Sequence, residues 1–188
     1  FVICGTLSLH IFVPALPVAA RDLGVSAGTI ELTLTVYVMG LAIGQLFYGP
    51  ISDRLGRRPV LLGGLVLYAL GSIAAGLAPS AGALIAARVV QALGGCSGLV
   101  LGRAVIRDVS APHEAAGRLA WLNMFMSMGP ALASVVGGLL AAYVSWRAIF
   151  GLLAGIGVLT LATATAILPE TRPGGGGRNG GTLLRVNL

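Results

Sequence analysis

The chain has 188 residues, of which 56% are hydrophobic and 10% are charged, and its mean hydropathy is +0.94. A water-soluble domain carries about 25% charged residues, so this composition excludes a soluble enzyme core and predicts a membrane protein. The net charge of +6 does not indicate a nucleic-acid-binding domain, because the basic residues lie between long apolar runs rather than on polar segments.

Six apolar stretches follow one another, separated by short connections marked by polar residues, glycine or proline. Each is about 20 residues long, the length that an α-helix needs to cross a bilayer. Transmembrane strands are excluded, because each stretch is about twice the length of a barrel strand and lacks strict alternation. The predicted fold is all-α, with membrane spans near residues 1–20, 30–49, 60–78, 82–106, 117–142 and 148–168.

The first predicted span contains His10, a residue type that titrates near physiological pH. Two interpretations stay open: the imidazole serves in proton exchange or substrate contact, or it is neutral and hydrogen-bonded inside the helix bundle. Cys4 in this span and Cys96 in the fourth lie inside apolar runs. They are expected to be packing thiols, with no disulfide framework and no metal site.

The connection between the second and third spans, residues 49–59, holds one acid, Asp53, and three bases. It predicts a tight turn, which Gly56 permits. Asp53 can accept hydrogen bonds from the arginine forks or from the free amides that open the next helix. Basic content alone fits an ordinary cytoplasmic loop equally well.

The fourth predicted span carries a charged residue, Arg88, at hydrocarbon depth, with Gln91 one turn later on the same face. A charge there is costly, which predicts that Arg88 faces a cavity or a partner. The alternative is an arginine that snorkels to the outer headgroups. Gly94, Gly98 and Gly102 repeat every four residues in this span and predict the close approach of another helix.

The last two spans contain helix-weakening residues. Pro130 in the fifth span removes a backbone hydrogen bond and predicts a bend. Gly151 and Gly155 in the sixth span repeat, more weakly, the close-packing pattern of the fourth. Residues 169–188 are predicted to form the glycine-rich start of a cytoplasmic linker, and the chain is expected to continue beyond both of its ends.

Orientation follows from the arginines, since all twelve basic residues are arginine and basic residues near span ends are retained in the cytoplasm. Nine of them lie between the second and third spans, flank the connection between the fourth and fifth, or follow the sixth. The alternate connections hold only Arg21 and Arg147, and Arg88 lies inside the fourth span. Both ends of this segment are therefore predicted to be cytoplasmic in a multi-pass protein of the cell membrane. The nine are Arg54, Arg57, Arg58, Arg103, Arg107, Arg118, Arg172, Arg178 and Arg185.

Residues 49–58 resemble the cytoplasmic-loop signature of the major facilitator superfamily, G-x-x-x-D-R-x-G-R-R/K. The matching residues are Gly49, Asp53, Arg54, Gly56, Arg57 and Arg58. Further matches are Pro14-Ala15-Leu16-Pro17, Gly44-Gln45, Arg88 with Gln91 and Gly94, Arg107-Asp108, Trp146 to Phe150, and Leu168 to Thr171. Together they resemble the N-terminal six-helix half, a three-plus-three inverted repeat, of the drug:proton antiporters of the Bcr/CflA type.

The resemblance implies roles for individual residues. Asp53 and Arg57 would belong to a charged latch that holds the outward-facing state, and Arg88 would serve proton coupling. His10 stands where this type of antiporter usually has an acid. The antiporter signature of span five is matched by Gly129, Gly137 and Gly138, whereas Ala133 and Ser134 replace a glycine and a proline and Pro130 lies one turn earlier.

The resemblance also implies a function: proton-coupled export of small amphipathic or drug-like molecules, with the proton gradient as the energy source and no cofactor. A second six-helix half would complete the substrate cavity, and spans one, two, four and five would line it. The predicted lining residues are Tyr37, Gln45, Arg88 and Asn123. Two alternatives stay open: uptake of a polar solute, and a non-transporting scaffold or sensor on the same fold. An enzyme or ATP-driven pump is not expected, because no phosphate loop or metal-ligand cluster is present.

Overall fold

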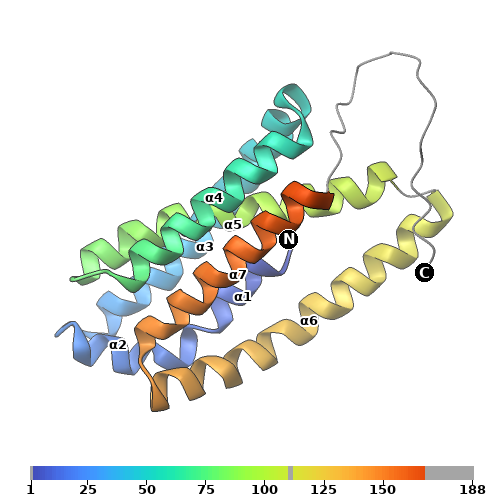
Figure 1. Ribbon diagram of the computed structural model, residues 1–188. Helices are drawn as coiled ribbons and strands as arrows, with labels where there is room; N and C mark the ends of the chain where they lie inside the picture. The colour runs from blue at the N-terminus through green and yellow to red at the C-terminus, as the bar shows by residue number, and fades with distance from the viewer. Residues whose placement is uncertain (1, 110–111, 168–188) are drawn as a thin grey trace.

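All regular structure is helical in the computed structural model, which describes residues 2–109 and 112–167 (Figure 1). Six segments of these ranges are long and apolar enough to cross a membrane, which confirms the predicted fold class. The predicted linker at residues 169–188, with Arg172, Arg178 and Arg185, lies outside the described residues. The helices are α1 (Ile3–His10), η1 (Val13–Ala15), α2 (Leu16–Asp22), α3 (Ala27–Leu55), α4 (Arg57–Gly76), α5 (Ala81–Val109), α6 (Pro112–Tyr143) and α7 (Trp146–Ile167).

The first span is divided rather than continuous. α1 ends at His10, a short 3-10 turn covers Val13–Ala15, and α2 completes the crossing to Asp22. Pro14 and Pro17 lie in the first turns of η1 and α2. Neither proline has an N–H for an α-helical hydrogen bond, so the backbone changes its helical pattern where they occur.

The second span extends further than the sequence predicts. α3 continues through Pro50 to Leu55, and α4 begins at Arg57. The predicted turn over residues 49–59 therefore shortens to Gly56 alone. Gly56 has φ +98°, a conformation that side chains disfavour, and this explains a glycine at the point where two long helices meet.

Helices α3, α4, α5 and α7 form the closely packed part of the bundle, because glycines let their backbones approach. A Cβ on Gly40 of α3 would lie 2.8 Å from the Cβ of Ala92 in α5. A Cβ on Gly94 of α5 would overlap the backbone of Tyr68 in α4. Gly94 thus has the close-packing role that the sequence predicts, and Gly102 has it against Val2.

In α7 the close-packing glycine differs from the predicted pair. Among the described residues, nothing lies within 4 Å of a Cβ built on Gly151 or Gly155, so these two residues do not pack closely against the described helices. Gly157 is the packed position, where a Cβ would lie 2.8 Å from the ring of Tyr68. The sequence pattern marks glycines four apart, but the tilt of α7 on α4 decides which of them meets the neighbour.

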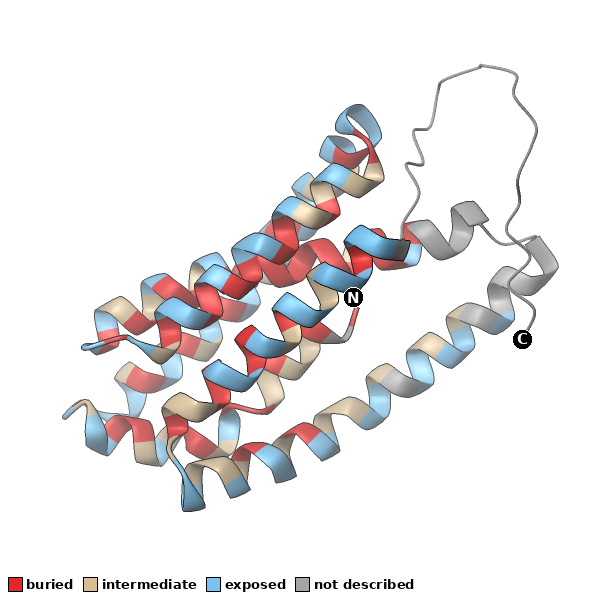
Figure 2. Cartoon of the chain, viewed as in Figure 1, coloured by how far each residue is buried: buried red, intermediate tan, exposed pale blue. Residues whose placement is uncertain are grey.

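Helix α6 lies along the edge of the bundle, where it contacts α1, η1, α5 and α7 (Figure 1). Figure 2 shows that most of its described surface is exposed or half-buried. Between residues 117 and 143, the buried residues of α6 among those whose burial is described are Ala133 and Gly137. The face of α6 that is exposed in this chain is therefore available to lipid or to a further part of the protein.

Candidate functional site

Arg88 lies about two turns into α5 and is fully buried, with 0% of its surface exposed. Its Nη1 donates to the carbonyl oxygen of Ser8 at 3.1 Å and to Oε1 of Gln91 at 2.8 Å. The snorkelling alternative is wrong, because the guanidinium points to α1 and to its own helix instead of reaching the surface. The predicted proximity of Gln91 is confirmed.

Hydrogen bonds extend from Gln91 across the bundle. Gln91 Nε2 donates to Ser72 Oγ at 2.8 Å, and Ser72 Oγ donates to the carbonyl of Tyr68 at 2.7 Å. The Tyr68 hydroxyl is 2.6 Å from Ser8 Oγ, so the network returns to α1. Ser8, Tyr68 and Ser72 are all buried, and the sequence interpretation did not include them. The signal that could have identified them is the presence of a polar residue inside an apolar run.

Three aromatic rings surround the Arg88 guanidinium. Its Cζ lies 4.2 Å from the ring centroid of Tyr37, 5.2 Å from that of Phe12 and 5.6 Å from that of Phe150. Electron-rich ring faces attract a cation, and the attraction is larger where water is absent. Tyr37 is itself fully buried and donates its hydroxyl to the carbonyl of Gly5 at 2.8 Å. The sequence interpretation expected Tyr37 to line an open cavity. In the structure its ring packs against Arg88 instead.

The buried charge of Arg88 is incompletely paired. Its Nε and Nη2 are buried and have no hydrogen-bond partner among the described residues. The contacts of the guanidinium in this part of the chain are a carbonyl, an amide oxygen and three rings, and no carboxylate is among them. An unpaired buried donor lowers folding stability by about 1–3 kcal/mol. A purely structural residue would therefore not be expected to keep this arrangement.

A groove of about 440 Å³ opens between α1, α3, α5 and α6, which are the spans predicted to line the substrate cavity. Gln45, one of the predicted lining residues, lies at this groove. Arg88 is buried and Asn123 is exposed on α6, and neither is among the lining residues. The lining residues are Thr6, Leu41, Gln45, Leu99, Val100, Arg103 and Met126.

His10 lies at a different groove, of about 500 Å³, between α1 and α3. The described residues that line this groove with it are mainly apolar, and they include Leu34 and Val38. His10 is not among the hydrogen-bond or ring contacts of Arg88, and its carbonyl accepts a hydrogen bond from Ser134 Oγ of α6 at 3.4 Å. The structure therefore shows no direct contact between His10 and Arg88, which the sequence interpretation grouped with Gln91 for proton coupling.

The signature residues of the α3–α4 connection form a charged cluster at the bundle's rim around Gly56. Arg57 Nη1 lies 3.1 Å from Asp53 Oδ1 and donates to Ser52 Oγ at 3.0 Å. Arg58 Nη2 donates to the carbonyl of Thr165 near the end of α7, at 3.1 Å. Asp53 and Arg57 are thus brought together as predicted, although most of the signature is helical.

The other signature residues have less contact. Arg54 is exposed, and a Cβ on Gly49 would meet nothing within 4 Å. A substitution at either position therefore has room in this conformation. Their place in the signature is not explained by packing within the described residues.

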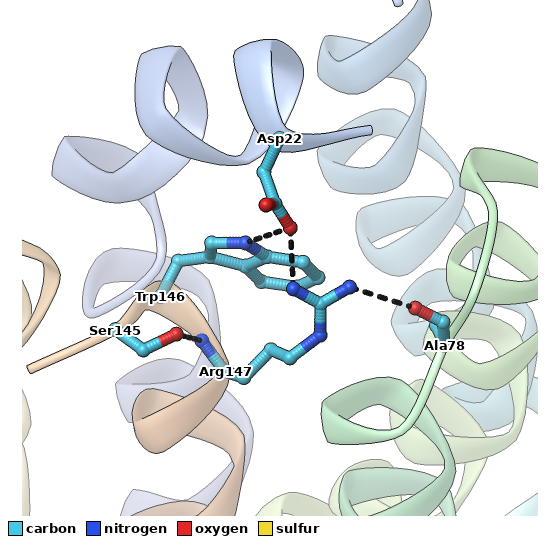
Figure 3. A network of polar contacts seen from close by, with 5 residues as sticks. All are labelled: Asp22, Ala78, Ser145, Trp146 and Arg147. Atoms are coloured by element: carbon cyan, nitrogen blue, oxygen red, sulfur yellow. Dashed lines mark hydrogen bonds and ion pairs between the residues drawn. The ribbon is translucent and has the colours of Figure 1, made fainter. Parts of the chain in front are cut away.

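At the opposite rim, Asp22 joins α2 to the start of α7 (Figure 3). It accepts hydrogen bonds from Trp146 Nε1 at 3.0 Å and from Arg147 Nη1. Arg147 Nη2 also donates to the carbonyl of Ala78, after α4, at 3.3 Å, and its guanidinium lies 4.3 Å from the Trp146 ring centroid. This cluster fixes the ends of three spans. The sequence matched Trp146 and Arg147 to a family pattern but did not identify Asp22 as their partner.

The span-five residues have distinct environments. A Cβ on Gly137 would overlap the carbonyl oxygen of Ile11, in the break of the first span, whereas Gly129 has open space. A Cβ built on Gly138 would lie 3.8 Å from Cβ of Pro14, which is ordinary van der Waals contact. α6 is assigned as one helix through Pro130, whose carbonyl accepts a hydrogen bond from Ser134 Oγ at 2.9 Å. Gly137 is therefore a contact position between α6 and the divided first span.

The profile of the Major Facilitator Superfamily matches residues 1–187. Relatives include the "Chloramphenicol resistance protein" of Pseudomonas aeruginosa, which is 40% identical over 92% of this chain and 41% of its own length. The "Multidrug resistance protein D" of Escherichia coli is 36% identical over 90% of this chain and 43% of its own length. The "Bicyclomycin resistance protein homolog" of Haemophilus influenzae is 32% identical, over 87% and 41%.

The chain spans about two fifths of the length of these relatives, and it aligns with them over nearly all of its own residues. Six apolar helices, the charged Gly56 turn and the family match agree with one another. The chain therefore belongs to the major facilitator superfamily of multi-pass membrane transporters.

Proposed function

We propose that this chain is one half of a proton-coupled transporter that exports small amphipathic, drug-like molecules through the cell membrane. The observation that carries the proposal is the buried and incompletely paired Arg88. A scaffold on the same fold has no need of a charge that costs free energy at this depth. The printed names of three relatives refer to resistance against chloramphenicol, multiple drugs and bicyclomycin, which supports export of such molecules.

The substrate cavity of the whole protein would lie between this half and a second six-helix half. The groove between α1, α3, α5 and α6 forms the wall that this chain supplies. A proton gradient drives transport, and no cofactor is needed. The sparse contacts of α6 within this chain fit a helix that packs against the second half.

Arg88 would act on proton binding through its charge. A guanidinium stays protonated in proteins, so Arg88 itself carries no proton across the membrane. Because Nη1 depends on the carbonyl of Ser8 in α1, a movement of α1 relative to α5 changes how well the charge is compensated. The affinity of a nearby titratable group for a proton then differs between the two orientations of the cavity, which is the requirement for coupling.

The Gly56 rim would be cytoplasmic and the Asp22–Arg147 rim external, in keeping with the arginine distribution. Single cysteines at the exposed positions Arg54 and Pro79, in a version with Cys4→Ala and Cys96→Ala, test this orientation. A membrane-impermeant maleimide added to intact cells is expected to label the Pro79→Cys variant and to leave the Arg54→Cys variant unlabelled. The reverse pattern would contradict the orientation.

The transport proposal is tested with the full-length protein in proteoliposomes. An imposed pH gradient is expected to drive accumulation of radiolabelled chloramphenicol, and a pH-sensitive dye inside the vesicles should report a countermovement of protons. Protein-free vesicles and the Arg88→Ala variant are the controls. Accumulation that does not change when the gradient is collapsed would contradict proton coupling.

A further inference from the structure

The acidic residues of this chain avoid the middle of the membrane. Asp22 ends the first candidate span, Glu31 lies in the first two turns of the second, and Asp53 lies in its last turn. The other acids lie outside the candidate spans Ala81–Ala104, Leu119–Tyr143 and Trp146–Ala166. The full set is Asp22, Glu31, Asp53, Asp108, Glu114 and Glu170. No candidate span thus supplies a carboxylate from its middle.

The groove between α1, α3, α5 and α6 contains a cation instead. Arg103 of α5 lines it and is exposed, and its Nη2 reaches the sulfur of Met126 in α6 at 3.9 Å. A thioether is a weak acceptor and carries no charge. Among the described residues, Arg103 has no carboxylate within ion-pair distance, so its printed contact does not neutralise its charge.

The other lining residues divide into two kinds. Thr6 and Gln45 supply polar groups, and Gln45 is exposed toward the groove. Leu41, Leu99 and Val100, together with the Met126 side chain, supply apolar surface. A ligand that complements this lining has an apolar body and one compact group that accepts hydrogen bonds.

We propose that this groove binds amphipathic organic anions, with a carboxylate on Arg103 and the apolar body on the leucine and valine side chains, and that it discriminates against organic cations. This inference rests on the proposed transport function and specifies its substrate class. A guanidinium fork matches the geometry of a carboxylate, and a charge-assisted hydrogen bond is about twice as strong as a neutral one. An organic cation would meet the positive charge of Arg103 in the groove, which is an effective means of rejection.

The test uses three probes with the same apolar body and different charge: phenylbutyrate, phenylbutanamide and phenylbutylammonium. Their binding to the purified full-length protein in nanodiscs is measured by calorimetry near neutral pH. We expect phenylbutyrate to bind about tenfold more tightly than phenylbutanamide and phenylbutylammonium to bind most weakly. Equal binding of the three probes, preference for the cation, or no binding of phenylbutyrate would overturn the inference.

Variants assign the preference to Arg103. In Arg103→Gln the advantage of phenylbutyrate over phenylbutanamide should disappear, and in Arg103→Lys part of it should remain. Unchanged binding of phenylbutanamide shows that a variant has kept its groove. The matched control is Arg21→Gln, which removes an exposed arginine outside the groove and should leave all three affinities unchanged. A full anion preference in Arg103→Gln would contradict the assignment.

The outcome is separable from that of the transport proposal. If chloramphenicol is moved by a pH gradient but the probes show no charge preference, the inference about the groove fails and the proposed function stands. If phenylbutyrate binds with the expected preference but the pH gradient does not drive accumulation of chloramphenicol, the transport proposal fails and the anion site stands.

Discussion

Two arginines join distant helices in this half, and they are held in opposite ways. Arg88 is fully buried and is compensated by a carbonyl, an amide oxygen and aromatic rings. Arg147 at the rim has a carboxylate partner, Asp22, and their side chains are 39% and 46% exposed. The cation that pairs with an acid is in reach of water, whereas the cation at membrane depth has no acid among its contacts.

The difference indicates different purposes. An exposed ion pair gains little free energy, so Arg147 acts mainly by fixing where the ends of three spans lie. A buried cation without an acidic partner has hydrogen-bond donors that lack an acceptor, and a conformational change or a protonation event can supply one. We therefore expect substitutions of Arg88 to affect function most and substitutions of Arg147 to affect assembly.

The largest effect is expected for Arg88→Ala in the full-length protein. Loss of the charge should reduce transport driven by a pH gradient to background, while Arg88→Lys, which keeps the charge without the planar fork, should retain part of it. Stability should fall by about 1–3 kcal/mol, because Gln91 Oε1 loses its donor. The measurement is transport in proteoliposomes with and without a pH gradient. Transport by Arg88→Ala with an unchanged dependence on the gradient would refute the functional assignment.

Asp53→Asn extends the comparison to the Gly56 rim. The change removes one charge of the Asp53–Arg57 pair, and Asp53 is 61% exposed, so folding should tolerate it. If the pair favours one orientation of the cavity, a bias of about 1.4 kcal/mol corresponds to a tenfold fall in turnover. Transport per molecule of protein in the membrane is the measurement, with Asp22→Asn as the matched change at the other rim. A parallel fall of expression and transport would make Asp53 structural only.

Tyr68→Phe sharpens the comparison on the buried side. It removes the hydroxyl that lies 2.6 Å from Ser8 Oγ and leaves the charge of Arg88 unchanged. We expect a loss of about 1 kcal/mol in unfolding free energy, with transport preserved to within a few fold. Thermal unfolding of the purified protein is the measurement, and Tyr143→Phe, at a tyrosine that is 83% exposed, is the control. Equal unfolding temperatures for both variants would show that the Tyr68 hydroxyl does not stabilise the bundle.

The smallest effect is expected at the Asp22–Arg147 pair. A double-mutant cycle with Asp22→Asn and Arg147→Gln should give a coupling energy of about 0.2–1 kcal/mol, because both side chains are partly exposed. The coupling should decrease at high salt. A coupling above this range would show that the rim pair stabilises the bundle as strongly as buried contacts do.

The deep and the rim arginines are joined by packed rings. Phe12 and Phe150, which both face Arg88, lie 6.3 Å and 6.1 Å from Trp146 by ring centroids, and Trp146 donates to Asp22. The rings of Phe12, Phe150 and Trp146 thus form one continuous apolar contact between the two arginines. A change of packing at the rim has a direct physical route to the Arg88 pocket.

Local features were predictable from the sequence because spacing along a helix determines them. The Arg88–Gln91 contact follows from a separation of three residues within one helix. The Asp53–Arg57 pair was implied by the resemblance to the family signature, and it spans the break at Gly56. The six spans follow from the length and apolarity of the runs. The division of the first span was not predicted, although Pro14 and Pro17 were visible as the cause.

Contacts between helices could not be predicted, because helical periodicity marks the faces of a helix and not the neighbour that each face meets. His10 and Arg88 both lie in the membrane part of the sequence, yet the rotation of α1 directs His10 to a groove of its own. Tyr37 was expected to line a cavity and instead packs against Arg88.

By itself, the sequence determined that this chain crosses a membrane six times as helices, where its charges cluster and which superfamily signature it carries. These properties depend on transfer of side chains from water to lipid and on local spacing. Only the tertiary structure decided that Arg88 meets Ser8, 80 residues away, that Asp22 pairs with Arg147, and that Arg103 rather than Arg88 lines the groove. The physical reason is that the tilt and rotation of each helix are set by how its small residues fit the neighbouring backbone, a relation between segments that no single segment contains.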